Sequence, residues 1–237
     1  MTPAIQIKDV RFRYEDMDMR FDLEVAAGRF LAVIGPSGAG KSTLLNLIAG
    51  FEVPLGGEIA LMGRPAAGVS PSERPVTIVF QEHNLFPHLD VWANVALGRA
   101  THLKLDAAGE EAVRKALARV GLLGFERRRP KELSGGERQR VALARCLVRE
   151  RPILLLDEPF AALGPALRRD MLELLTALWR EQKLTVVLVS HDPDDARRAA
   201  TDVAFVHAGR ILRHGSVHQV LDATDLPELT EYLGRPL

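Results

Sequence analysis

The chain has 237 residues, of which 47% are hydrophobic and 26% are charged. This length suits one large domain or one domain with an insertion, and the balance of residue types excludes a disordered or fibrous chain. Basic and acidic residues number 31 each, so the formal net charge is zero, which disfavours a strongly basic nucleic-acid-binding protein.

The first 60 residues alternate between apolar and polar side chains. Apolar residues recur there at mostly every second position, as they do in half-buried strands. The residues concerned are Ile5, Ile7, Phe12, Tyr14, Phe21, Leu23 and Val25. We therefore expect a small antiparallel sheet at the start of the chain.

Short, continuous apolar runs follow, and they suit strands that are buried on both faces of a parallel sheet. The runs occupy residues 30–34, 76–80, 153–156 and 185–189. Each is followed by polar or glycine-rich residues. Near the end of the chain, residues 204–206 and 211–212 flank an Ala-Gly-Arg turn and predict a hairpin.

Helical patterns lie between these runs. Apolar spacing predicts helices over 41–49, 141–148 and 165–179, and Asp192 before Pro193 predicts a short helix. Apolar residues from 113 to 120 predict a further helix, with Asp106 as its cap and Gly121 as its stop. Strands and helices that alternate in this way indicate an α/β sheet. The stretch from about 85 to 150 shows no clear strand, so we expect a helical insertion within a single domain of residues 1–237.

The cysteine count, the N-terminal residues and the length of the apolar runs indicate the cellular compartment. One cysteine, Cys146, excludes an internal disulfide framework and is typical of a reducing compartment. Charged residues interrupt the N-terminus too early for a secretory signal, and no apolar run has the length of about 18 residues that a membrane span requires. We expect a cytosolic protein that reaches a membrane only through a partner.

The clearest motif is a phosphate-binding loop between a buried strand and a helix. Gly35-Pro-Ser-Gly-Ala-Gly-Lys-Ser42 matches G-x-x-x-x-G-K-[ST], in which backbone N–H groups and the helix N-terminus face one anion. Lys41 is expected to reach the β and γ phosphates, and the Ser42 hydroxyl to bind Mg²⁺. The candidate nucleotide-binding residues are Gly35, Pro36, Ser37, Gly38, Ala39, Gly40, Lys41, Ser42 and Thr43. Kinases, GTPases and transport ATPases share such a loop.

Two carboxylates end the buried run that begins at Ile153. Ligands bind beyond the carboxyl ends of strands in open α/β sheets, so Asp157 is placed to hold Mg²⁺. Glu158 points elsewhere because it is one residue further on, and it can polarise a water that attacks the γ phosphate.

A second helix start can also bind phosphate. Ser134 and Glu137 form a capping box, and Gly135 and Gly136 between them expose the N-terminal amides of the helix. A nucleotide kinase has no use for this second site. A symmetric dimer does, because the loop of one subunit and residues 134–137 of the other can enclose one ATP.

The set of motifs resembles that of the ATP-binding subunits of ABC transporters. The phosphate loop, the Leu-Ser-Gly-Gly signature, the Ile-Leu-Leu-Leu-Asp-Glu strand, Gln81 and His191 stand in the order of that family, over nearly the whole chain. The resemblance implies a P-loop NTPase (RecA-like) core with an N-terminal antiparallel β subdomain and an inserted α-helical subdomain. It also implies hydrolysis of ATP with Mg²⁺.

The resemblance extends to three further site residues. Gln81 can offer a carbonyl to Mg²⁺ or to the attacking water, and in the family its segment also senses the membrane subunit. His191 can donate a hydrogen bond to the γ phosphate and orient Glu158 as the base. Tyr14 resembles the aromatic residue that stacks on adenine, with Phe12 as the alternative.

The chain departs from the family pattern at two positions. Glu137 replaces the more common glutamine of the signature, and a capping box tolerates either residue. Gly164 stands where the family usually has an aspartate that crosses the dimer interface. A glycine can still cap the helix that begins at Pro165, so we expect the change to affect the coupling of the two sites rather than the fold.

A short chain of this kind resembles an importer subunit, and three of its segments resemble most closely the ATPases of bacterial thiamine importers. These segments begin at Gly35, Val79 and Leu133. ATPases of iron, molybdate, sulfate and polyamine importers are alternatives, as is a soluble non-transport ABC ATPase. The resemblance implies a homodimer, integral membrane permease subunits, an indirect periplasmic solute-binding protein, no nucleic acid, and a peripheral position on the cytoplasmic face of the inner membrane.

Overall fold

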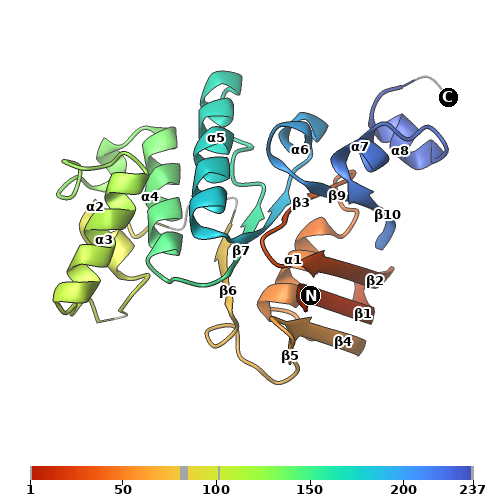
Figure 1. Ribbon diagram of the computed structural model, residues 1–237, viewed down its shortest axis with the longest axis horizontal. Helices are drawn as coiled ribbons and strands as arrows, with labels where there is room; N and C mark the ends of the chain where they lie inside the picture. The colour runs from red at the N-terminus through yellow and green to blue at the C-terminus, as the bar shows by residue number, and fades with distance from the viewer. Residues whose placement is uncertain (1, 81–84, 101, 236–237) are drawn as a thin grey trace.

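The computed structural model describes residues 2–80, 85–100 and 102–235 (Figure 1). Its strands are β1 (Pro3–Tyr14), β2 (Met17–Ala26), β3 (Phe30–Ile34), β4 (Gly56–Leu61), β5 (Arg64–Pro65), β6 (Val76–Val79), β7 (Ile153–Asp157), β8 (Thr185–Val189), β9 (Asp202–His207) and β10 (Arg210–Ser216). Its helices are α1 (Lys41–Ala49), α2 (Val91–Ala96), α3 (Ala107–Arg119), η1 (Pro130–Glu132), α4 (Gly135–Leu147), α5 (Pro165–Gln182), α6 (Pro193–Ala199), α7 (Val217–Leu221) and α8 (Pro227–Tyr232).

The described strands form one sheet in the order β5-β4-β1-β2-β10-β9-β3-β8-β7-β6. Strands β9, β3, β8, β7 and β6 are mutually parallel, and every residue of β3 and β8 is buried, as their continuous apolar runs predict. The carboxyl ends of parallel strands share one edge of a sheet. At this edge Asp157 pairs with Val189, and Ile34 pairs with Phe205.

The N-terminal strands β1, β2, β4 and β5 are antiparallel, as predicted, but they do not form a sheet of their own. One parallel pair, Arg20 with Arg210, joins β2 to β10 and so to the parallel strands. A register shift between Ile7 and Val10 interrupts β1, and Asp9 at this irregularity has φ 46°. The bulge explains why strict alternation fails along β1, since one extra residue reverses which side chains face the core.

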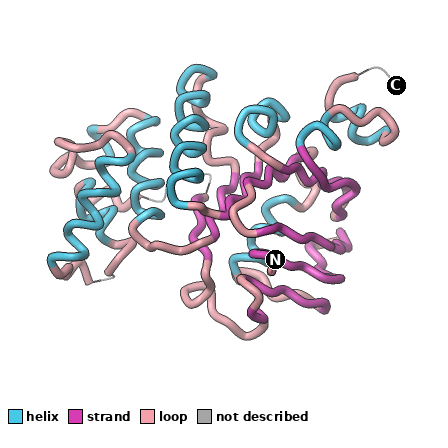
Figure 2. The backbone as a smooth tube through the Cα atoms, in the orientation of Figure 1, coloured by secondary structure: helices cyan, strands magenta, loops and turns pink. Residues whose placement is uncertain are grey.

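A helical lobe separates β6 from β7 in the chain. It contains α2, α3, η1 and α4, and Figure 2 shows only helix and loop in this part of the molecule, to the left of the sheet. Val95, Leu117 and Leu143 from three of its helices are buried in one apolar cluster. The cluster continues through Leu172 of α5 to Leu188 of β8, so the lobe and the sheet share a core.

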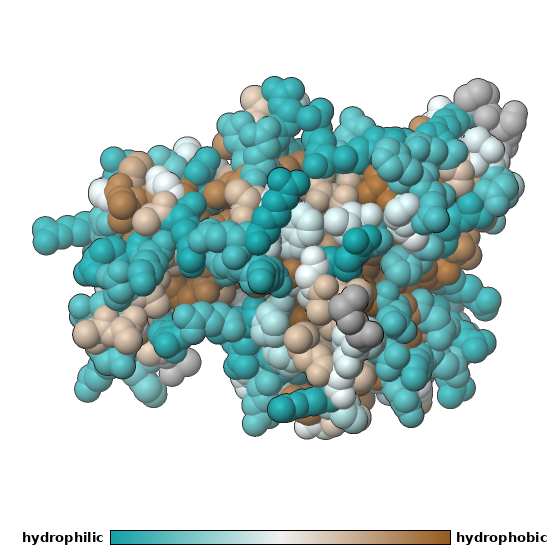
Figure 3. Space-filling view, in the orientation of Figure 1, coloured by the Kyte–Doolittle hydropathy of each residue, from teal (hydrophilic) through white to brown (hydrophobic). Residues whose placement is uncertain are grey.

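The chain ends in two short helices, α7 and α8, which the sequence analysis did not predict. Val220 and Leu229 bury their side chains against Phe205 of β9. Hydrophilic side chains cover most of the face of the molecule shown in Figure 3. In the part of the chain that the structure describes, no helix combines the length and the apolar character that a membrane span requires.

Candidate functional site

The loop between β3 and α1 adopts a backbone that only glycine accepts at two positions. Gly35 has φ 148°, and a Cβ atom there would lie 2.0 Å from the carbonyl oxygen of Val206. Gly40, the N-cap of α1, has φ 101° and packs against Met19 and Phe21 of β2. The loop therefore lies against both the end of β9 and strand β2, with the N-terminus of α1 at its centre.

Lys41 spans this loop. Its side chain is buried, with 6% exposed, and Nζ donates hydrogen bonds to the carbonyl oxygens of Gly35 at 2.8 Å and Pro36 at 2.7 Å. Burial lowers the pKa of Lys41, and the charges of Glu158 and Asp157 oppose that shift. A cation that is held in this way at a helix N-terminus suits a polyphosphate ligand, whose negative charge compensates the cost of burial.

Ser42 and Asp157 face each other across the sheet edge. The Ser42 hydroxyl donates a hydrogen bond of 3.0 Å to Oδ1 of Asp157. Burial raises the pKa of Asp157, the Ser42 hydroxyl lowers it, Glu158 raises it and Lys41 lowers it. The described residues contain no cluster of three or more His, Cys, Asp or Glu side chains that suits a metal ion. One carboxylate and one hydroxyl nevertheless fit Mg²⁺ with a nucleotide, since this ion usually takes one or two protein carboxylates together with water and phosphate oxygens.

Glu158 and His191 form the second pair at this edge. Nδ1 of His191 lies 3.0 Å from Oε2 of Glu158. The Glu158 backbone has φ 43°, and its N–H donates to the carbonyl oxygen of Val189 at 3.1 Å. This left-handed conformation at the end of β7 turns Glu158 away from the direction of Asp157. A carboxylate beside an imidazole, near a phosphate-binding loop, has the groups that general-base activation of water requires.

The signature segment forms a capped helix start. The Glu137 N–H donates to Oγ of Ser134 at 3.3 Å, and the Ser134 N–H donates to Oε2 of Glu137 at 2.6 Å. The bond from the Ser134 backbone lowers the pKa of Glu137. Gly136 packs closely on α5, because a Cβ atom there would lie 2.8 Å from the methyl groups of Leu167. These bonds join Ser134 and Glu137 to each other rather than to the phosphate loop of the same chain.

The β1–β2 hairpin lies beside the phosphate loop. The Gly209 N–H donates to the Ala39 carbonyl at 3.0 Å, and the Arg20 N–H donates to the Gly209 carbonyl at 2.9 Å. At the end of this hairpin Tyr14 is 55% exposed, whereas the ring of Phe12 packs against the core. This difference favours Tyr14 as the ring available to an adenine.

Gln81 lies outside the described residues. Gly164 is the N-cap of α5, in an extended conformation with φ −65°, and an added Cβ atom would have no other atom within 4 Å.

Sequence reasoning missed two residues near the site. Arg168 of α5 donates to both carboxylate oxygens of Asp195 and to Oγ of Ser190, so it ties α5 to the segment around His191. Tyr232 of α8 donates a hydrogen bond to the carbonyl oxygen of His191. Neither residue belongs to a motif, and the partners of both are distant in the sequence.

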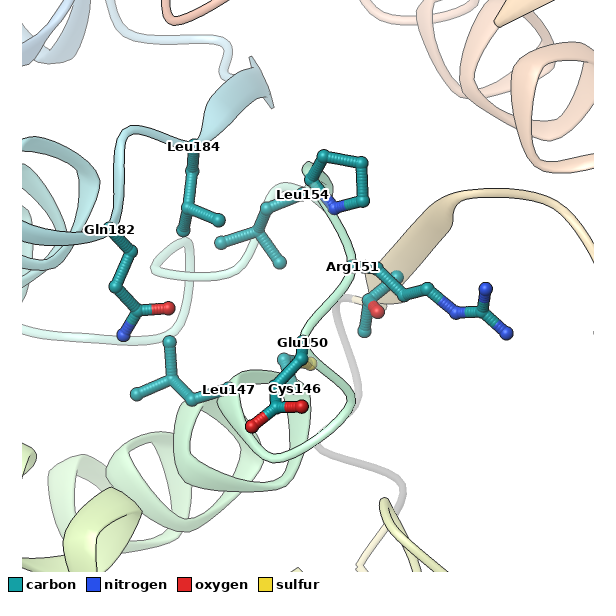
Figure 4. A pocket seen from close by; sticks show the side chains of 9 residues that line it. Cys146, Leu147, Glu150, Arg151, Leu154, Gln182 and Leu184 are labelled. Atoms are coloured by element: carbon teal, nitrogen blue, oxygen red, sulfur yellow. The ribbon is translucent and has the colours of Figure 1, made fainter. Parts of the chain in front are cut away.

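A cavity of about 300 Å³ lies away from this site (Figure 4). Thr77 and Leu154, near the amino ends of β6 and β7, line it together with Cys146 of α4 and Gln182 of α5. Burial raises the pKa of the Cys146 thiol to about 12, which makes it unreactive at neutral pH. The cavity occupies the opposite edge of the sheet from Asp157 and Glu158.

The chain is similar to known proteins over nearly its whole length. The sequence model of the family described as ABC transporter matches residues 19–161. The thiamine import ATP-binding protein ThiQ of Rhizobium meliloti (strain 1021) is 52% identical and aligns over 98% of this chain and 97% of its own. The ThiQ protein of Photobacterium profundum is 51% identical over 93% of this chain and 91% of its own.

Solved structures are similar as well. cbiO1 from Clostridium perfringens, part of the ABC transporter complex cbiONQ, has a TM-score of 0.85 at 27% identity, over 94% of this chain and 92% of its own. An inward-facing metal-chelate type ABC transporter contains a chain with a TM-score of 0.84 at 28% identity, over 100% of this chain and 90% of its own.

Proposed function

The chain belongs to the ABC transporter family of ATP-binding subunits, and we propose that it hydrolyses ATP to drive the import of thiamine into a bacterial cell. The observation that carries the choice of solute is the 52% identity to a thiamine import ATP-binding protein over nearly the full length of both chains. The solute contacts other subunits of an importer, so the relatives, rather than a residue of this chain, support thiamine over iron, molybdate, sulfate or polyamines.

Uptake of labelled thiamine by a bacterial strain that lacks this chain tests the solute directly. We expect uptake to be lost and to return when the wild-type chain is supplied. The Lys41→Ala variant is the matched control, because it lacks the buried ammonium of the phosphate loop and should not restore uptake. Normal thiamine uptake in the deletion strain, with loss of iron, molybdate, sulfate or polyamine uptake, would contradict the proposal.

Hydrolysis follows from the two pairs at the sheet edge. The phosphate loop and Lys41 bind the β and γ phosphates through N–H donors. Glu158 accepts the proton of the water that attacks the γ phosphate, and His191 holds the Glu158 carboxylate through the 3.0 Å contact at Nδ1. Gln81 completes the set by orienting that water. General-base catalysis of this kind contributes about 10²–10⁴-fold to the rate.

Magnesium is part of this proposal. Ser42 and Asp157 are the residues that would hold it, with Gln81 as a further oxygen donor, because they supply the hydroxyl, carboxylate and amide oxygens that this ion prefers. When bound, the ion neutralises negative charge that develops on the transferred phosphoryl group.

The active form is a head-to-tail homodimer. In one chain the hydrogen bonds of Ser134 and Glu137 are made with each other, and Ser134 is exposed at the start of α4, where the helix N-terminus can accept a phosphate. A second copy, related by a two-fold axis, can place its 134–137 segment over the nucleotide that the first copy holds at 35–43. Each nucleotide is then shared by two chains, so ATP binding favours closure and hydrolysis reopens the pair.

A groove between the sheet and the helical lobe suits a membrane partner. It has a volume of about 440 Å³ and includes Phe51, Phe80 and Phe86 among its lining residues, with Arg149, which follows α4. Phe51 is 51% exposed and Phe86 is 44% exposed, although aromatic side chains of this size are usually buried unless a partner covers them. We propose that an apolar segment of the permease occupies the groove, with the chain on the cytoplasmic face of the inner membrane and a periplasmic solute-binding protein as an indirect partner.

A further inference from the structure

The C-terminal helix α8 places one hydroxyl against the backbone of the His191 segment. Oη of Tyr232 donates a 2.8 Å hydrogen bond to the carbonyl oxygen of His191, 41 residues earlier in the chain. The backbone of Gly35, the first residue of the phosphate loop, lowers the pKa of the Tyr232 phenol.

The ring of Tyr232 is fixed by its packing. Its centroid lies 5.5 Å from that of Phe205, which is fully buried on β9. Phe205 pairs with Ile34, the residue that directly precedes Gly35. Burial raises the pKa of Tyr232 to about 12, and the Gly35 backbone opposes that shift, so the phenol keeps its proton at neutral pH and remains a donor.

Helix α8 itself is anchored to the body of the protein. Leu229 is fully buried in the cluster formed with β9 and α7. Arg235, just beyond the helix, donates to the carbonyl oxygen of Leu221 at 2.7 Å. Thr230 donates to the carbonyl oxygen of Leu226 at 3.0 Å within the same helix. The hydroxyl of Tyr232 therefore extends from a rigid support.

We propose that Tyr232 is a positioning residue for ATP hydrolysis, which fixes the backbone of His191 through its hydroxyl and thereby holds the imidazole on Glu158. Tyr232 acts on the backbone of His191, whose side chain makes the 3.0 Å contact with Glu158. The inference rests on the proposed roles of Glu158 and His191. It lies outside the part of the chain that the family model matches, which ends at residue 161.

The substitution Tyr232→Phe removes only the hydroxyl and keeps the ring that packs on Phe205. We expect kcat for ATP hydrolysis by the full chain, assembled with its membrane subunits, to fall about 3- to 10-fold, the usual consequence of losing one hydrogen bond. KM for ATP should stay within about two-fold, because the loop and Lys41 still bind the phosphates. Unchanged kcat in Tyr232→Phe would overturn the positioning role.

A matched variant separates positioning from stability. Thr230→Val also removes one hydroxyl from α8, but that hydroxyl bonds within the helix and does not contact His191. We expect Thr230→Val to keep wild-type kcat while its melting temperature falls at least as far as that of Tyr232→Phe. Equal losses of kcat in both variants would mean that α8 acts only through stability, which would overturn the inference.

A third variant separates this inference from the proposed function. His191→Ala should lose most turnover. If His191→Ala loses turnover while Tyr232→Phe keeps it, the positioning role alone fails. If His191→Ala retains full turnover, the proposed role of the histidine fails, and the role of Tyr232 fails with it.

Discussion

Ser42 and Asp157 lie 3.0 Å apart, from Oγ to Oδ1, although 115 residues separate them in the chain. The parallel order of β3, β8 and β7 brings the start of α1 and the end of β7 to one edge of the sheet. Burial raises the pKa of Asp157, and the Ser42 hydroxyl only partly opposes this. The carboxylate is therefore held where its charge is unfavourable in the free chain, and a bound cation removes that cost.

The first prediction concerns Asp157→Asn. The raised pKa means that the folded chain binds more protons than the unfolded chain between the unfolded and folded pKa values of Asp157. Ionised Asp157 therefore lowers the free energy of unfolding at neutral pH. The amide removes this cost and keeps an oxygen for Ser42, so the nucleotide-free variant should melt at a higher temperature at pH 7. The gain should vanish below the unfolded carboxyl pKa.

The same substitution should reduce magnesium-dependent ATP hydrolysis by about 10²-fold or more, because it removes a charged ligand from the site. Calorimetric melting curves and phosphate-release assays measure the two effects. Asp170→Asn on the exposed face of α5 is the control and should change neither quantity. A variant that melts lower than wild type at pH 7 would refute the account of the buried charge.

Tyr14→Ala should weaken ATP binding by about 1–3 kcal/mol, the usual contribution of stacking between a base and an aromatic ring. Tyr14→Phe should keep the affinity, since it keeps the ring. Phe12→Ala should lower the melting temperature without changing the affinity, because that ring packs on the core. Titration calorimetry measures the affinity of each variant for ATP. A loss of affinity in Phe12→Ala alone would reassign the stacking residue.

Gly164→Asp should raise ATPase activity and cooperativity in the assembled transporter. The site has room for the side chain. Because aspartate and glycine both cap helices, the free energy of unfolding should change by only about a few tenths of a kcal/mol. The added carboxylate can accept hydrogen bonds from a second copy and favour closure by about 0.5–1.5 kcal/mol. Gly164→Ala fills the same space without the charge and should not raise activity. An unchanged rate and Hill coefficient in Gly164→Asp would show that the glycine is no defect.

Phe86→Ala should reduce recovery of this chain with its permease in a pull-down from membranes, by about ten-fold if Phe86 is an anchor in the centre of the interface. The intrinsic ATPase activity of the isolated chain should remain. Leu123→Ala is the matched control, because Leu123 is also an exposed apolar residue of the helical lobe but does not line the groove. Equal recovery of both variants would show that the permease binds at another surface of this chain.

Several features of the fold were predictable because local chemistry determines them. The continuous apolar runs predict β3 and β8, and the Ser134–Glu137 capping box predicts the start of α4. Asp192 before Pro193 predicts α6. In the structure the Asp194 N–H donates a 2.9 Å hydrogen bond to the Asp192 side chain, which caps this helix. In each case the residues that decide the structure are neighbours in the chain.

The remaining features depend on contacts between distant residues. The single pair that joins Arg20 to Arg210 makes one sheet of two predicted parts, and no local pattern encodes it. The bulge at Asp9 shifts the register of β1 against β2, so that the side chains that face the core change from one alternate set to the other. Tyr232 lies in a short helix stabilised mainly by its packing on β9, and its contact with His191 exists only in the folded chain. Residues of this kind belong to no sequence motif.

The most direct test of the proposed mechanism is ATP turnover by Glu158→Gln. The amide keeps the shape of the side chain and removes the base, so ATP affinity should remain while turnover falls by about 10²–10⁴-fold. The same variant should accumulate as an ATP-bound dimer, which size-exclusion chromatography detects as a doubling of mass. Turnover near the wild-type rate, with no dimer in the presence of ATP, would contradict both the catalytic role of Glu158 and the closed homodimer.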